Sequence, residues 1–352
     1  MNTSITKNTT TLFKKSGNKL QHTASSEKES IAHKAFLWLT VFLLSGYLLT
    51  HPSLSFTAIN NALIFCFKTL IPSLFPFMIA GEVLILSGFP LICDKYLGKL
   101  FNRVFGISGK GAAAFIIGAF CGFPVGAKTA VMLYTSGEVD KKEAERLSGI
   151  CNNGGIGFLI SGIGIGIWQS PAFGIALYFS QLISAAIAGI LLFGTRKKTF
   201  ASSSINCKDT SPEKTFSVSE TVSTAISTAV LSMLRITGFV VFFEVLLSAL
   251  SSILSYVGAG LLSTCLLSAF TEITAGAKAL KLLSTIPSYS WSLLAKILTF
   301  TISAWGGLSV YMQFCAFAFP SGISTRSYLK SKLTQSLICT LIGTLLVLFR
   351  VV

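Results

Sequence analysis

Residues 118–128 read GAFCGFPVGAK, and they place three glycines, a proline and a lysine inside an otherwise apolar run from Ala112 to Tyr134. Glycine permits unusual backbone angles and proline ends a helix, so this composition would break a soluble helix. A lysine is also unfavourable in a helix that spans a bilayer. Residues 268–278, SAFTEITAGAK, form a second polar and broken stretch. Both stretches therefore need a common physical explanation.

The composition is too apolar for a soluble protein. The 352 residues are 52% hydrophobic and 12% charged, whereas soluble domains carry about 25% charged residues. We therefore expect an all-α polytopic membrane protein. The net charge of +15 falls mostly between apolar runs, as in cytoplasmic loops beside anionic lipid. We expect no nucleic-acid partner, because no recognised binding motif accompanies the charge.

Cysteine and histidine usage argues against a metal site, a cofactor or a disulfide frame. The eight cysteines form no CxxC pair, and the three histidines lie near the amino terminus. We therefore do not expect an intramembrane enzyme. Residues 1–34 are rich in Ser, Thr and Lys and lack the apolar core of a signal peptide, so we expect a disordered cytoplasmic leader.

Apolar runs of about twenty residues predict about seven full spans. We expect residues 35–194 to hold the first helix and a first repeat, 195–220 to form a polar cytoplasmic linker, and 221–352 to hold a second repeat and the last helix. Basic clusters around Lys110 and Lys141 should both be cytoplasmic. The segment between them is then a re-entrant hairpin with its tip near GFPVG, and a kinked full span is the alternative.

Three features recur in the same order in both halves. Each half has a span with a glutamate, a glycine-broken hairpin that ends in GAK, and a span with a glycine break. Loop charges orient the halves oppositely, so we predict an inverted structural repeat with two re-entrant helical hairpins. This build is typical of secondary transporters that bind substrate near the midplane. The matching features are Glu82 and Glu244, Lys128 and Lys278, and the breaks at 153–155 and 305–307.

Buried charge and broken helices predict a midplane site for a small anion. Charged side chains in mid-membrane usually face a cavity or a partner, and free N–H groups at helix starts attract anions. The alternatives are lysines that snorkel to the membrane edge, glutamates paired structurally with lysines, and small residues that serve helix packing. The candidate substrate-binding residues are Gly122, Pro124, Gly126, Lys128, Asn152, Asn153, Gly154, Glu272, Thr274, Gly276, Lys278, Ser309 and Gln313.

Five stretches together resemble the YlbJ-type sporulation integral membrane proteins, which belong to the wider nucleoside-recognition (Gate) domain group. The resemblance implies a stage V sporulation protein in the outer forespore membrane of a spore-forming bacterium, linked to the movement of dipicolinate. This chain reads NNGGI at 152–156, where the family usually has NNSGP. The stretches are LIPSLFPF (70–77), CGFPVGAK (121–128), EAERLSGICNNGG (143–155), TEITAGAK (271–278) and GGLSVYMQ (306–313).

The leading hypothesis is a secondary transporter or facilitator of a small organic anion, with dipicolinate as the anion that the resemblance implies. The alternatives are a structural or assembly membrane protein for spore cortex formation and a nucleoside-type transporter. Expected partners are a small anionic solute and membrane lipid, with a homo-oligomer left open. A carrier predicts that substitution of Lys128, Asn153 or Glu272 abolishes uptake while the protein still inserts.

Overall fold

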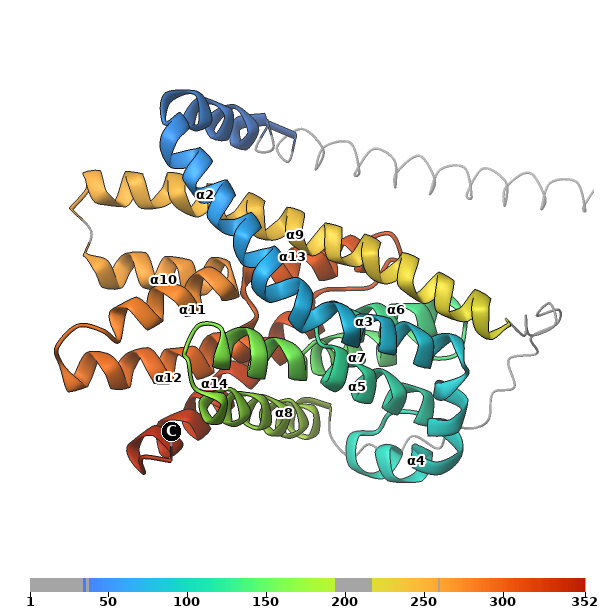
Figure 1. Ribbon diagram of the computed structural model, residues 1–352. Coiled ribbons are helices and arrows are strands. Elements are labelled where there is room, and N and C mark those ends of the chain that lie inside the picture. The colour runs from blue at the N-terminus through green and yellow to red at the C-terminus, as the bar shows by residue number, and fades with distance from the viewer. Residues whose placement is uncertain (1–33, 36–37, 194–216, 259, 352) are drawn as a thin grey trace, which may run out of the picture. The chain divides into compact units, whose positions relative to one another are not determined.

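The computed structural model describes residues 34–35, 38–193, 217–258 and 260–351 (Figure 1). All the regular structure within these ranges is helical, as the composition predicts. The expected leader, apart from Lys34, and most of the 195–220 linker lie outside the described residues. The chain divides into two compact units, Met1–Thr57 and Ala58–Val352. The first contains an apolar helix, Trp38–Thr50, and the second contains every site discussed below.

The helices follow the order of the apolar runs. Up to the linker, they are α2 (Pro52–Phe65), η1 (Cys66–Leu70), α3 (Ile71–Leu86), α4 (Phe89–Phe105), α5 (Gly109–Cys121), α6 (Val125–Thr135), α7 (Lys141–Cys151), η2 (Gly157–Ile165) and α8 (Pro171–Phe193). After the linker they are α9 (Val218–Tyr256), α10 (Leu261–Thr271), α11 (Ile273–Leu283), α12 (Tyr289–Trp305), α13 (Gly307–Ala318) and α14 (Arg326–Leu348).

Five helical stretches in the described ranges are long and apolar enough to cross a membrane. The pair α4 and α5, bent by 88°, makes a sixth if it is counted as one span. The expectation of about seven spans is therefore met only in part by length and composition. The five stretches are Pro52–Leu86, Pro171–Phe193, Val218–Tyr256, Tyr289–Ala318 and Arg326–Leu348.

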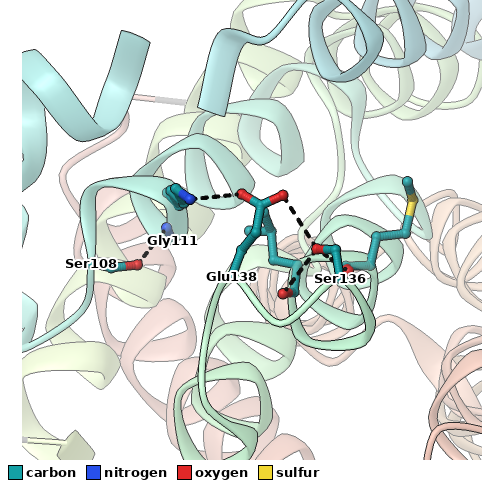
Figure 2. A network of polar contacts seen from close by, with 7 residues as sticks. Ser108, Gly111, Ser136 and Glu138 are labelled. Atoms are coloured by element: carbon teal, nitrogen blue, oxygen red, sulfur yellow. Dashed lines mark hydrogen bonds and ion pairs between the residues drawn. The ribbon is translucent and has the colours of Figure 1, made fainter. Parts of the chain in front are cut away.

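The GFPVG stretch is the turn between two antiparallel helices, α5 and α6. Lys110 Nζ, at the start of α5, lies 3.2 Å from Glu138 Oε2, just after α6. Figure 2 shows the polar network at this end, where Ser136 and Glu138 lie near the start of α5. One continuous helix would hold these ends roughly 40 Å apart. The segment therefore folds back on itself and is not a single kinked helix.

A second helical hairpin consists of α10 and α11, which lie beside α12 in Figure 1. Cys265 Sγ donates to the carbonyl oxygen of Ala279 at 3.4 Å. Nearer the turn, a Cβ added to Gly276 would lie 2.5 Å from Ala269 Cα. Residue numbers therefore rise along one helix as they fall along the other, and the pair is antiparallel. The turn falls at Glu272, whose backbone is extended.

Two further helices are interrupted where glycine follows a polar or aromatic residue. Residues 152–155 separate α7 from η2, and Gly306 separates α12 from α13. Gly306 and Gly307 have φ values of 83° and 86°, in the left-handed region that glycine adopts without steric cost. Helix α8 packs against η2, and α14 packs against α7 and α12. Each broken helix is thus held by a continuous helix.

Candidate functional site

In each half, the glutamate on the long helix pairs with the lysine of the GAK stretch. Lys128 of α6 forms an ion pair with Glu82 of α3, and Lys278 Nζ of α11 lies 3.4 Å from Glu244 Oε1 of α9. Lys278 Nζ also lies 4.0 Å from the ring centroid of Phe65, a cation–π contact. Both glutamates are therefore paired with lysines, as in the structural alternative that the sequence leaves open. Neither lysine offers an unneutralised charge to a solute in this conformation.

Each hairpin turn packs directly on the helix break of its own half. A Cβ added to Gly122 would lie 2.3 Å from the backbone nitrogen of Gly155. A Cβ added to Gly307 would lie 3.0 Å from the carbonyl oxygen of Thr271 and 3.2 Å from Glu272 Cα. Both contacts are backbone against backbone, which explains why glycine occupies these places. Two turns and two breaks thus form two matching junctions.

Glu272 organises the second junction. Its carboxylate caps α11 by accepting from the backbone nitrogen of Ala275 at 2.7 Å and from the hydroxyl of Thr274. A negative charge is favourable at a helix N-terminus, where the free N–H groups gather. The side chain is buried, with 2% of the residue exposed. Glu272, which the sequence singles out as a candidate binding residue, therefore has a definite local role as the cap of α11.

A small cavity lies between the two halves, with Glu272, Thr274 and Gln313 as its polar lining and with aromatic walls from Phe123 and Phe158. Its volume is about 20 Å³, room for roughly one water molecule. The elements that meet there are η1 and α3, the first hairpin turn, η2, α9, the second turn and α13. A larger solute requires these elements to move apart.

The asparagine break faces α14. Asn152 Nδ2 donates to the Tyr328 hydroxyl at 3.0 Å, and Asn153 Oδ1 accepts from Lys332 Nζ at 3.2 Å. Lys332 also donates to Gln335 Oε1 at 3.1 Å and is 1% exposed. A hydroxyl and an ammonium group of α14 thus satisfy much of the polarity that the break exposes, as buried polar groups require.

Gln181 of α8 joins the two broken helices. Its Oε1 accepts from the backbone nitrogen of Gly154 at 3.1 Å, and its Nε2 donates to the carbonyl oxygen of Ser303 at 2.8 Å. The first bond is at the α7–η2 break and the second lies three residues before the α12–α13 break. One fully buried amide therefore links both halves.

The candidate residues divide into three groups. Glu272, Thr274 and Gln313 line the cavity, and Gln313 Nε2 lies 3.4 Å from the hydroxyl oxygen of Ser309. Gly122, Gly126, Pro124 and Gly276 make the hairpin turns or close helix contacts, with a Cβ on Gly126 only 2.0 Å from the carbonyl oxygen of Cys151. The third group is not among the residues that line this cavity: Lys128 and Lys278 in ion pairs, Asn152 and Asn153 facing α14, and Gly154 bonded to Gln181.

Several polar residues of these junctions do not stand out in the sequence. Lys332 reads as one of a group of basic loop residues with Arg326 and Lys330, yet it lies buried in α14. The usable signal is its spacing, because Lys332 and Gln335 are three residues apart and share one helix face. Gln181 gives a comparable signal as a lone amide in the apolar stretch of α8.

The fold and these junctions define an integral, multi-pass, all-helical membrane protein with broken helices and helical hairpins around a buried polar centre. The chain is 27% identical, over 332 aligned residues, to the sporulation integral membrane protein YlbJ of Bacillus subtilis (strain 168). The alignment covers 85% of this chain and 78% of the relative. It confirms the resemblance to YlbJ-type sporulation membrane proteins. No family model matches the chain, and no solved structure matches it.

Proposed function

We propose that the protein is a secondary transporter or facilitator of a small organic solute, acting in the membrane during sporulation. The observation that carries the proposal is the packing of each hairpin turn on the helix break of its own half, with one small cavity between the two halves. Discontinuous helices at mid-membrane are how secondary transporters build a substrate site. In this conformation the cavity is too small for such a solute, and opening toward either face in turn gives alternating access.

We further propose that the two halves form an inverted repeat with about seven full spans and two re-entrant hairpins, of the Gate-domain kind. The order of elements supports this: a helix with a glutamate, a hairpin, a broken helix and a closing helix occur in both halves. The two glutamate–lysine pairs join equivalent elements. Oppositely oriented hairpins would then enter from the two faces of the membrane and meet at the cavity.

The proposed substrate is a small organic anion, and dipicolinate moved across the outer forespore membrane is the specific candidate. The resemblance to YlbJ-type proteins supports this choice, together with the start of α6 at the first turn, which has no side-chain cap and whose N–H end favours anions; at the second turn the Glu272 carboxylate already caps α11. A nucleoside-type solute is the second candidate. The Glu272 carboxylate and the Gln313 amide favour it, since they line the same cavity as the edge-to-face pair Phe123 and Phe158 and suit a flat, uncharged ring that carries N–H donors.

Reconstitution in liposomes tests the proposal directly. Purified protein that elutes as a single folded species is assayed for uptake of labelled dipicolinate and labelled uridine side by side. Flux of either solute above that of protein-free liposomes supports a carrier. Absence of both fluxes in folded protein would contradict the proposal for these substrates and favour a structural or assembly role.

Glu272→Gln separates the two candidate substrates. Glutamine keeps an acceptor oxygen for the α11 cap but removes the negative charge, so the fold should be retained. An anionic substrate should be taken up as well or better, because a repulsive charge has gone. A nucleoside that donates to the carboxylate should lose uptake by about tenfold or more, as expected for one charge-assisted hydrogen bond. Glu272→Ala, which removes the cap, should abolish uptake of either solute.

A further inference from the structure

A larger cavity lies at the open end of the second hairpin, away from the two turns. It is formed by the turn after η2 (168–173), the end of α11 with the loop that follows (281–285), and the first part of α12 (292–296). Its volume is about 300 Å³, at the lower end of the range for small-molecule sites. We call it the Lys281–Lys296 cavity, after the two charged side chains in its lining.

Positive charge dominates this cavity. Lys281 and Lys296 are both partly buried, and neither takes part in an ion pair with another described residue. The segments that form the cavity belong to two parts of the chain, 146–208 and 273–352, that contain no Asp or Glu. An incoming anion would therefore meet two ammonium groups and no carboxylate from these segments.

The remaining lining adds donors and an aromatic wall. Trp168 Nε1 is buried and has no hydrogen-bond partner among the described residues. An indole N–H can only donate, and a buried donor without an acceptor costs free energy. The Trp168 ring lies 4.6 Å, between centroids, from the Phe173 ring and 5.2 Å from Lys281 Nζ. A ligand with an acceptor oxygen and a flat apolar part would suit both features.

The two lysines also depart from the charge pattern of this end of the protein. The connections at 169–171 and 258–260 carry no acidic or basic residue and are predicted to lie on the non-cytoplasmic side. Lysine is disfavoured in short loops there. The turn at 169–171 contributes Ser170 to the same cavity as both lysines. Their presence therefore needs a reason other than topology.

We propose that the Lys281–Lys296 cavity binds a small anion that carries a carboxylate or phosphate group beside an apolar or aromatic part. The ammonium groups hold the anionic group, and the Trp168–Phe173 pair receives the apolar part. A role for this cavity as a loading site, from which solute passes to the small cavity lined by Glu272 and Gln313, rests on the proposed transport function. As an anion site it stands by itself, and the anionic group could come from a free solute or from a lipid headgroup.

Binding to the full-length protein in phosphatidylcholine nanodiscs tests the inference, with dipicolinate and inorganic phosphate as separate probes in calorimetric titrations. Lys281→Gln/Lys296→Gln should raise the Kd for at least one probe by about tenfold or more, the effect of losing one or more charge-assisted hydrogen bonds. Lys281→Arg/Lys296→Arg should retain binding. The matched control, Lys99→Gln/Lys330→Gln, removes the same charge from two exposed positions and should change the Kd by less than about twofold.

A lipid arm identifies the source of the anionic group. Wild-type protein and the double glutamine variant are purified from membranes with phosphatidylglycerol, and retained lipid is counted by mass spectrometry. Loss of phosphatidylglycerol in the variant, with no probe binding to either protein, would assign the cavity to a headgroup phosphate. If neither probe binding nor lipid retention depends on the lysines, the inference is wrong.

Flux measurements keep this inference separate from the transport proposal. If the lysines govern binding but the wild-type protein moves no solute, the anion site stands and the carrier proposal fails. If the wild-type protein moves solute but probe binding is unchanged in the double glutamine variant, the carrier proposal stands and the anion-site inference fails. With both correct, the double glutamine variant should raise the half-saturating concentration for uptake by about tenfold and leave the saturated rate nearly unchanged.

Discussion

Gly122 shows how much of this structure depends on the absence of a side chain. Its φ is +80°, and a Cβ would lie 2.3 Å from the backbone nitrogen of Gly155. Gly137 has a similar φ of +77° but open space around it. The two glycines therefore share a positive φ but differ in how closely neighbouring atoms pack against them.

Gly122→Ala should cost clearly more stability than Gly137→Ala. Both variants place alanine at a positive φ that L residues rarely adopt, which costs about 1–3 kcal/mol. Only the first must also push apart the hairpin turn and the helix break, which adds about 1–3 kcal/mol. Thermal unfolding in detergent measures the difference. Equal losses in the two variants would mean that the turn does not press on the break.

The Glu82–Lys128 pair should matter far more than the pair at the hairpin's open end. Glu82→Gln leaves a largely buried ammonium without its partner, which costs about 3–5 kcal/mol. Glu138→Gln disrupts a pair whose side chains are 25% and 35% exposed and should cost at most about 1 kcal/mol. Glu82→Gln/Lys128→Gln should recover part of the loss, and unfolding of all three variants checks this. A Glu82→Gln protein as stable as Glu138→Gln would refute it.

The elements are arranged so that continuous helices hold broken ones. Helix α8 reaches both broken helices through Gln181, and α14 holds the asparagine break through Tyr328 and Lys332. A rigid helix beside each break allows the interrupted backbone to remain ordered while keeping its polar groups satisfied. The hairpins need no such support, because their two helices pack on each other.

Gln181→Leu should therefore destabilise both halves together. It keeps the side-chain volume similar but leaves the Gly154 N–H and the Ser303 carbonyl without this partner, at about 1–3 kcal/mol for each buried group. Thr334→Ala, at a partly exposed position whose hydroxyl bonds among the described residues to the carbonyl oxygen of Lys330, is the control and should cost less than about 0.5 kcal/mol. Unfolding midpoints compare the two. A neutral Gln181→Leu would show that α8 does not join the breaks.

Across the whole molecule, the features that local chemistry determines were predictable from the sequence. The turn at GFPVG follows from glycine and proline between two basic clusters, and the breaks follow from glycine at 154–155 and 306–307. The sequence does not identify which lysine pairs with Glu82 or with Glu244, because each partner lies dozens of residues away on another helix. Lys332 reads as a loop charge in the sequence, because its burial arises only when α14 packs against α7. The cavity beside Trp168 likewise joins segments far apart in the chain.

The orientation of the two hairpins is the feature on which transport by alternating access depends. The described native cysteines are all buried, so replacing Cys207, which lies outside the described residues, by serine gives a suitable background. Single cysteines at Lys110, Lys141 and Thr285 mark the open ends of the two hairpins. Each is treated with a membrane-impermeant maleimide in intact and in permeabilised cells.

We predict that cysteines at 110 and 141 react only after permeabilisation and that the cysteine at 285 reacts in intact cells. That result would place the two hairpins on opposite faces of the membrane. Labelling of 110 and 141 from opposite sides, or of 285 from the same side as both, would contradict the inverted arrangement and the carrier built on it.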